Sequence, residues 1–325
     1  MRRRDFTIGL LLAAAAGSAR AQDVAKPRRI AVVAAVLPPD MITAIAGGTP
    51  WRAFFEELRR LGYVEGRNII VERYSPEGHS ERHADLARQV VSRNPDLIVT
   101  GTGLLARAFG AATTTIPIVS SLAEAYRPGF AASLARPGGN VTGVSSEAGI
   151  EIWGKRLQLL KDAVPSVSRV GYIAVRAAWE GAEGQELRDA SQRLGISQVG
   201  SPLDEVSPSE YRRVFAQLSQ MQADGLIVTS AGGTWAHRQL IVELAETNRL
   251  PAIHPYRESV ELGGLMAYST DLGAMWQRIA DYVDQILNGA KPSDIPIYQA
   301  TKFELLINLK AAKALGLNIA PTPTR

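Results

Sequence analysis

The chain of 325 residues contains no cysteine, so it can form no disulfide, carry no lipid on a cysteine and use no thiol nucleophile. Histidine is scarce as well, with 4 residues. Only His79 and His83 have the i, i+4 spacing that can share a metal on a helix, and no third ligand is evident beyond Glu77 or Glu81. We therefore expect a solvated helix start and no metal site. No Ser-His-Asp arrangement is evident either, which leaves a hydrolase unsupported.

Long apolar runs and long basic runs are also absent. The apolar run from Ile8 to Ala16 falls short of the ~20 residues that a membrane-spanning helix needs, and no later run approaches that length. Four arginines against one aspartate give residues 1–21 a net charge of +3, which leaves about +1 of the formal +4 for the rest of the chain. Nucleic-acid binding through phosphates needs a larger, clustered surplus. We expect neither a membrane span nor a nucleic-acid partner.

The first 21 residues have the three parts of a cleavable export signal. The basic start Arg2–Arg4 precedes the apolar run, and Ala19-Arg20-Ala21 provides a small-x-small cleavage site. Residues 3–6, with the sequence Arg-Arg-Asp-Phe, resemble a twin-arginine motif, while the general secretory route fits equally well. We expect the mature protein to begin near Gln22 and to be soluble and periplasmic, without a lipid anchor.

Alternating strand and helix patterns run through the rest of the chain. Short Val- and Ile-rich runs are each followed by a segment with helical spacing, as in parallel strands joined by helices. The predicted strands are 30–37, 68–74, 96–100, 116–121, 140–145, 169–175, 225–229, 252–254 and 264–268. The predicted helices are 51–61, 81–92, 104–113, 152–163, 184–194, 209–221, 237–248 and 273–287. About 300 mature residues exceed what one core usually organises, so we predict an α/β fold of two doubly wound, Rossmann-like lobes.

Ligands of open α/β sheets bind beyond the carboxyl ends of the strands, where helix N-termini expose unpaired N–H groups. In the first lobe this rule selects Leu37, Thr102, Gly103, Ser120, Ser121 and Glu124. The small-residue turn at 100–103 leads into a helix, so its amides could hold a carboxylate. The alternative is a turn that needs only the backbone freedom of glycine.

In the second lobe the same rule selects Trp179, Thr234, Trp235, His254 and Tyr256. Their three large aromatic side chains predict a flat apolar wall suited to an aromatic or otherwise planar ligand. Ordinary packing of the lobe core would explain the same aromatic residues equally well.

Residues 268–271 lie where the chain is expected to cross back between the lobes. Tyr268 or Asp271 could therefore reach the ligand or act at the hinge. Asp271 could meet an amino group of the ligand, or it could cap the helix that begins near Gly273.

Four segments of this sequence resemble one protein family. They are LGYVEGRN at 61–68, RPGGNVTGV at 136–144, KPSDIP at 291–296 and TKFELLINLKAAKALGL at 301–317. These segments are similar to the ABC-transporter substrate-binding family that includes tryptophan and tyrosine binders. The chain departs from the family pattern after its fourth strand, where Ser120 to Ala125 replace an Asp-Pro pair, and in the loop after Val175, which lacks Asn-Pro.

The resemblance implies a type I periplasmic-binding-protein fold with three crossovers forming a hinge. Residues 27–145 and 270–295 would form the first lobe, and residues 146–269 and 296–325 the second. It implies a monomer without a cofactor that captures a small solute and delivers it to an inner-membrane ABC permease. An amino acid, especially an aromatic one, is the first expectation, and a nucleobase-like molecule or an aromatic acid would use the same wall.

Two other functions are compatible with parts of the sequence. Residues 101–106 match the dinucleotide fingerprint G-x-G-x-x-[G/A], and Glu124 follows about twenty residues later. The motif lies on the third strand rather than the first, so a dinucleotide-dependent enzyme is the weaker alternative. The other alternative is a periplasmic ligand-sensing module for a membrane receptor.

Overall fold

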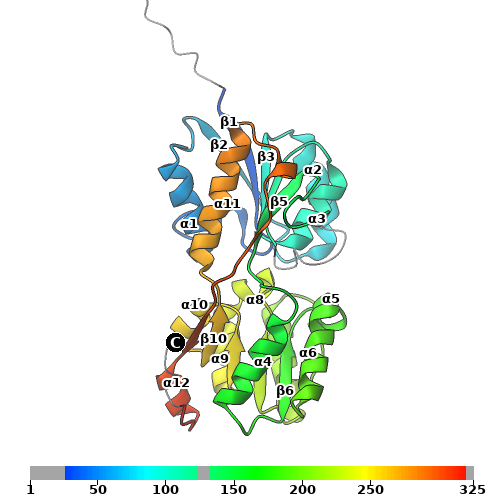
Figure 1. Cartoon of the computed structure of the whole chain (residues 1–325), viewed down its shortest axis with the longest axis vertical. Coiled ribbons are helices and arrows are strands. Elements are labelled where there is room, and N and C mark those ends of the chain that lie inside the picture. The colour runs from blue at the N-terminus through cyan, green and yellow to red at the C-terminus, as the bar shows by residue number, and fades with distance from the viewer. Residues whose placement is uncertain (1–25, 123–131, 320–325) are drawn as a thin grey trace, which may run out of the picture.

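The computed structural model describes residues 26–122 and 132–319. The predicted export signal at 1–21 and Glu124 lie outside these residues. The described chain forms two α/β lobes, one above the other in Figure 1, each built around a six-stranded sheet. The strand order is β11-β5-β4-β3-β1-β2 in the first sheet and β12-β10-β9-β8-β6-β7 in the second. The predicted pair of doubly wound lobes is confirmed.

The first sheet is parallel throughout. Its strands are β1 (Arg28–Val33), β2 (Ile69–Tyr74), β3 (Leu97–Thr100), β4 (Ile118–Ser121), β5 (Val141–Ser145) and β11 (Tyr298–Gln299). Its helices are α1 (Gly48–Arg60), α2 (His83–Ser92), α3 (Gly103–Ala112) and α11 (Leu272–Leu287), with short 3₁₀ turns η1 (Pro39–Met41), η2 (Ser80–Arg82) and η3 (Pro292–Asp294).

Helices cover both faces of the first sheet, and strand alternation divides its core into two layers (Figure 1). Ile30 and Val32 of β1 pack with α1 and α11, where Trp51 and Trp276 also lie. Ala31 and Val33 point the other way and pack with the layer that includes Phe109 of α3. Continuous apolar runs are therefore what these strands require.

The second sheet is parallel except for β12, which pairs antiparallel with β10. Its strands are β6 (Arg169–Ile173), β7 (Ser197–Val199), β8 (Gly225–Val228), β9 (Ala252–His254), β10 (Met266–Ser269) and β12 (Glu304–Ile307). Its helices are α4 (Ile152–Ala163), α5 (Arg176–Glu180), α6 (Ala182–Arg193), α7 (Pro208–Gln220), α8 (Gly232–Ala236), α9 (Arg238–Thr247), α10 (Arg257–Glu261) and α12 (Leu309–Ala314).

The described part of the chain crosses between the lobes three times: after β5, after β10 and after β11. The last crossing falls later than predicted. Tyr298 and Gln299 pair with Val144 and Ser145 at the edge of the first sheet, so the chain leaves the first lobe after Gln299 rather than at residue 296. Two paired residues are too few to show a periodicity in the sequence.

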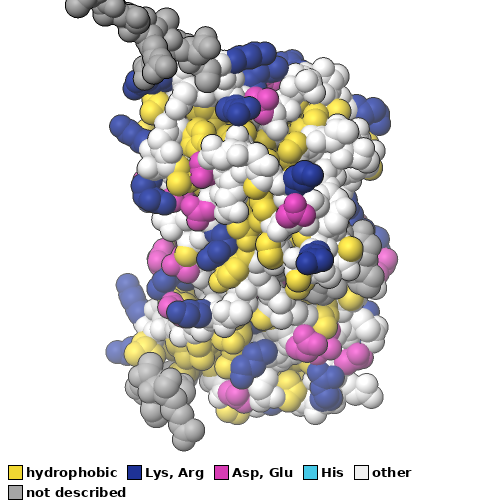
Figure 2. All heavy atoms as spheres, turned by 45° about the horizontal axis from the view of Figure 1, so that its top comes forward, with side chains coloured by type: hydrophobic (Ala, Val, Ile, Leu, Met, Phe, Trp, Pro, Cys, Tyr) yellow, Lys and Arg dark blue, Asp and Glu magenta, His cyan; other side chains and the backbone are white. Residues whose placement is uncertain are grey.

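The surface of the described residues has two features that bear on function. None of their helices combines the length and apolar character that crossing a membrane demands. Figure 2 shows Lys and Arg side chains interspersed with Asp and Glu side chains over one face. That face therefore lacks the continuous basic surface by which proteins attract nucleic-acid phosphates.

Candidate functional site

A cavity of about 150 Å³ lies between the lobes, where the carboxyl ends of both sheets meet. A cavity of this volume in another protein has room for benzene. The cavity lining combines loops after strands with the first turns of helices from both lobes. It comprises residues 34–37, 50–51, 101–104, 121, 146, 230–232, 235–236, 256, 272 and 276.

Aromatic rings face the cavity from both lobes. Trp51 of α1 and Trp276 of α11 lie with ring centroids 4.5 Å apart on the first-lobe side. On the second-lobe side, Trp235 and Tyr256 form an edge-to-face pair at 5.1 Å. Pairs of this geometry are favourable beyond the area that they bury. The cavity is therefore suited to a flat apolar group.

The second-lobe pair is fixed by polar contacts behind the rings. The Arg238 guanidinium lies 4.3 Å from the Trp235 ring centroid, and its Nη1 donates to the Trp235 carbonyl at 2.9 Å. The Tyr256 hydroxyl donates to the Ser230 carbonyl. Burial raises the pKa of Tyr256 well above its ordinary value, so the phenol is neutral at physiological pH. These contacts orient both rings at the cavity.

The lobes touch each other beside the cavity. Gly232 begins α8 so close to the first lobe that a Cβ there would lie 3.0 Å from Thr102 Cγ2 and 3.4 Å from Ala35 Cβ. A Cβ on Gly48 would likewise lie 3.6 Å from Trp235 Cζ2. Small residues at these positions let the two lobes approach around the cavity.

The first-lobe candidates differ in whether they line the cavity or are buried beside it. Leu37, Thr102, Gly103 and Ser121 line the cavity, and Thr102 also caps α3 by accepting from the Leu105 amide at 3.4 Å. Ser120 is fully buried below the cavity, where its hydroxyl accepts from Thr100 Oγ1 at 2.7 Å. Neighbouring strand residues point to opposite faces, which is why only Ser121 reaches the cavity.

The second-lobe candidates also divide into residues that line the cavity and residues that do not. Trp235 and Tyr256 line the cavity. Thr234 is buried, and its hydroxyl bonds to the Thr229 and Ala231 carbonyls at 2.6 and 2.7 Å. Trp179 is half-buried and stacks on Tyr172 with centroids 5.6 Å apart, against the core of the lobe. His254 is buried inside β9. Trp179 therefore packs against the lobe core, whereas Trp235 and Tyr256 lie at the cavity, where the aromatic wall was predicted.

The two candidates at the second crossover lie outside the cavity lining. Tyr268 stacks on Phe303 with ring centroids 5.3 Å apart. Asp271 caps α11 by accepting from the Ala274 amide at 2.9 Å, which is the capping alternative that the sequence left open. Both residues therefore have structural contacts beside the second crossover.

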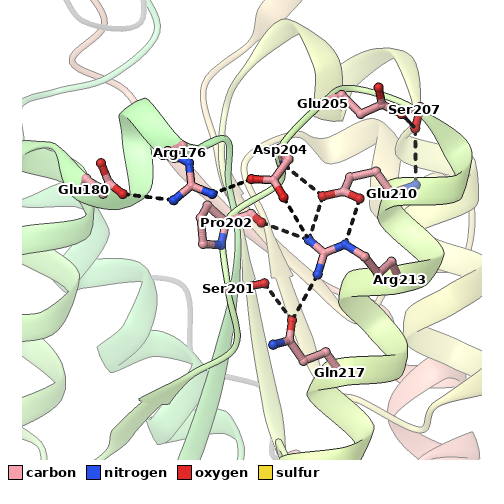
Figure 3. A network of polar contacts seen from close by, with 10 residues as sticks. All are labelled: Arg176, Glu180, Ser201, Pro202, Asp204, Glu205, Ser207, Glu210, Arg213 and Gln217. Atoms are coloured by element: carbon pink, nitrogen blue, oxygen red, sulfur yellow. Dashed lines mark hydrogen bonds and ion pairs between the residues drawn. The ribbon is translucent and has the colours of Figure 1, made fainter.

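A polar network joins α5 to the loop that contains Asp204 and to α7 (Figure 3). Arg176 at the start of α5 binds Asp204 and, at 3.2 Å, Glu180. On the other side of the Asp204 loop, Arg213 Nη2 donates to Glu210 at 2.6 Å. Figure 3 shows these groups converging between α5 and α7. The loop predicted after Val175 is instead a short anchored helix.

Replacing Trp179 by alanine is expected to reduce stability rather than ligand affinity. The ring packs on Tyr172 and on the core of the second lobe, so its loss should lower the free energy of unfolding by about 2 kcal/mol. Urea unfolding measures this change. A normal unfolding curve accompanied by weak ligand binding would contradict the placement.

The sequence rule missed Trp51 and Trp276, because it considered strand ends only. Both residues lie within the first five residues of their helices. In parallel α/β sheets those first turns lie beside the carboxyl ends of the strands, facing the same cleft. Large aromatic residues in the first turn of a crossover helix were the signal available in the sequence.

Comparisons with known proteins identify one family and one fold. The sequence model of the family described as ABC transporter substrate binding protein matches residues 29–322. A tyrosine-binding protein of Clostridioides difficile is 25% identical over 274 residues, which cover 82% of this chain and 76% of that protein.

Solved structures give the same fold. A conserved domain protein from Vibrio cholerae superposes with a TM-score of 0.77 at 24% identity, covering 91% of this chain and 96% of the other. A Streptococcus pneumoniae ABC domain in complex with L-Trp gives a TM-score of 0.76 at 21% identity, with the same coverage of 91% and 96%.

Proposed function

Because the chain belongs to the family of ABC transporter substrate-binding proteins, we propose that it captures one small solute with a planar aromatic group between its lobes. The observation that carries this proposal is the cavity with aromatic rings on both sides, Trp51 and Trp276 from one lobe and Trp235 and Tyr256 from the other. A solute held there contacts both lobes. Binding would therefore favour the arrangement in which the lobes are close together.

The family binds substrates and does not catalyse reactions, so the chain is not an enzyme. The G-x-G-x-x-A turn at 101–106 then serves the cavity rather than a dinucleotide. Its residues Gly101 to Leu104 line the cavity, and Gly101 packs against the backbone of β1 and the ring of Trp51.

An aromatic amino acid is the first solute class to test. The tyrosine-binding relative and the fold neighbour that holds L-Trp support this choice, and the aromatic cavity supports it independently. Aromatic acids and nucleobase-like molecules would present the same flat surface to the rings.

We further propose that the protein works in the periplasm, as a monomer, and delivers its solute to an inner-membrane ABC permease. The export signal predicted at 1–21 and the family membership support this proposal. Delivery to a membrane sensor would use the same closed lobes, and neighbouring genes for a permease and an ATPase would favour transport.

A thermal-shift screen tests the proposed function. The purified mature chain is heated with amino acids, aromatic acids, nucleobases and nicotinamide cofactors in separate wells. A solute at ~100 times its Kd adds ~2.7 kcal/mol of stability, which gives a readable rise in Tm. A rise with one aromatic solute supports the proposal. A rise with a dinucleotide alone would contradict it.

Replacing Trp235 by alanine is expected to weaken binding of that solute roughly 30-fold, since burying an aromatic side chain contributes about 2 kcal/mol. Calorimetric titration measures the change, and Trp179→Ala is the matched control because it removes the same ring outside the cavity. Equal affinities of the two variants would argue against the aromatic wall.

A further inference from the structure

A buried ion pair lies where the crossovers meet. Arg156 of α4 and Glu147 of the first crossover approach with Nη1 and Oε1 3.2 Å apart, and their side chains are 1% and 2% exposed. Glu147 follows Ser146, which lines the cavity. The pair itself is absent from the cavity lining formed by the described residues. Its position beside the crossovers points to an effect on how the two lobes are joined.

The same guanidinium also holds the second crossover. Arg156 Nε and Nη2 donate to the Tyr268 carbonyl at 3.3 and 3.1 Å, at the point where β10 leads into the crossing to α11. The planar fork of arginine permits this double engagement, which the single ammonium of lysine does not. One side chain thus joins two of the three connections between the lobes.

The third crossover is joined to the same group. Gln299 Nε2 donates to the Glu147 carbonyl at 3.2 Å, and the Ala300 amide donates to the Ser145 carbonyl at 3.1 Å. Phe303 stacks on Tyr268 and packs against the cores of both lobes. All three crossovers are therefore connected through Glu147, Arg156 and Tyr268.

We infer that Glu147 and Arg156 are positioning residues that hold the three crossovers in one arrangement and thereby favour close approach of the lobes. A buried ion pair is weak evidence for stability, because desolvation offsets its attraction, and specificity of arrangement is the better explanation. Glu147 Oε2 is buried without a hydrogen-bond partner among the described residues, so the pair is not optimised for stability alone. The inference rests on the proposed function in one respect: the arrangement of the crossovers affects ligand affinity only if the ligand binds between the lobes.

The absence of cysteine from the chain permits a direct test of lobe position. Spin labels are placed on Gln89→Cys of α2 and Gln192→Cys of α6, which are exposed helix positions in different lobes. Electron–electron double resonance then gives the distance distribution without ligand. We call Glu147 and Arg156 the clamp. The clamp variant Glu147→Leu/Arg156→Met replaces both charged residues, because removing one partner alone would leave the other charge buried and unpaired.

We expect the clamp variant to shift the ligand-free distribution to longer or broader distances and to weaken binding of an L-tryptophan probe. The matched control is Glu210→Leu/Arg213→Met, which removes the ion pair of Figure 3 away from the hinge and should leave the distribution unchanged. If the clamp variant lacks a cooperative thermal transition, Arg156→Lys replaces it, because lysine keeps the charge but loses the fork.

An unchanged distance distribution in the folded clamp variant, or in Arg156→Lys where that is used, overturns the inference. The distances are measured without ligand, so they test the clamp even if the protein binds no solute. Failure of every solute to bind the unsubstituted chain would overturn the proposed function instead, and the two failures are distinguishable.

Discussion

Replacing Gly232 by leucine is expected to weaken solute binding roughly 100-fold while leaving secondary structure intact. Even a Cβ at this position would lie 3.0 Å from Thr102 Cγ2 and 3.4 Å from Ala35 Cβ in the opposite lobe. Forcing extra methylenes into a packed contact costs about 1–3 kcal/mol, and here that cost falls on the arrangement that holds the ligand. These contacts lie between the lobes and not within one lobe, so the substitution should not lower the stability of either lobe by itself.

The matched control is Gly139→Leu. Within residues 26–122 and 132–319, no heavy atom lies within 4 Å of the ideal Cβ position of Gly139, so the added side chain meets none of them. Calorimetric titration compares the two variants, and circular dichroism verifies their folds. Full affinity in Gly232→Leu would show that the lobes do not need to approach at this point for binding.

The largest pH effect on stability is expected from His254. This histidine of β9 is 1% exposed, and its Nε2 has no hydrogen-bond partner among the described residues. Gly264 leaves room for the ring, because a Cβ there would lie 3.0 Å from Nε2. Burial lowers the pKa of His254 from its ordinary 6.5 to about 4, because the imidazolium would lose its solvation.

The direction of the pH dependence follows from proton uptake. Between pH 6.5 and 4 the unfolded chain binds a proton on this histidine and the folded chain does not. The contribution is therefore complete above pH 6.5 and is lost as pH falls to about 4, with a total of about 3 kcal/mol. Below pH 4 both states are protonated and no further loss occurs through this residue.

Urea unfolding at pH 7 and pH 4.5 measures this effect. His254→Leu removes the titrating group and should make the loss of stability between the two pH values about 2–3 kcal/mol smaller. His79→Gln, which changes a half-exposed histidine, is the control for removing a histidine from the chain. The same loss in all three proteins would argue against a buried neutral imidazole at residue 254.

The longer elements were predictable because each repeats its apolar pattern several times. Helix 152–163 and strand 252–254 have the predicted bounds, and the other long helices begin or end within two residues of prediction. The helices α5, α8 and α10 have five residues each and were missed. A segment shorter than two helical turns cannot show a period of 3.6, so its structure depends on contacts such as those of Arg176 with Asp204.

The site was only partly predictable, for a similar reason. The predicted strands and the strand-end rule were enough to select Thr102, Ser121, Trp235 and Tyr256, which line one cavity. They could not distinguish Ser121 from the buried Ser120, because that choice depends on the side of the strand. Nor could they show that Trp179 faces Tyr172, since that direction depends on packing against residues far along the chain in the second lobe.

The central claim is that the cleft holds one small aromatic solute between the lobes. Native mass spectrometry tests it most directly, with the mature chain and Gly232→Leu each incubated with a pool of L-tryptophan, L-tyrosine, phenylpropionate, indoleacetate, adenine and NAD. The account predicts a one-to-one adduct of one aromatic pool member, without NAD, that is largely lost in the variant. No adduct, an adduct with NAD alone, or an adduct retained equally by Gly232→Leu would contradict it.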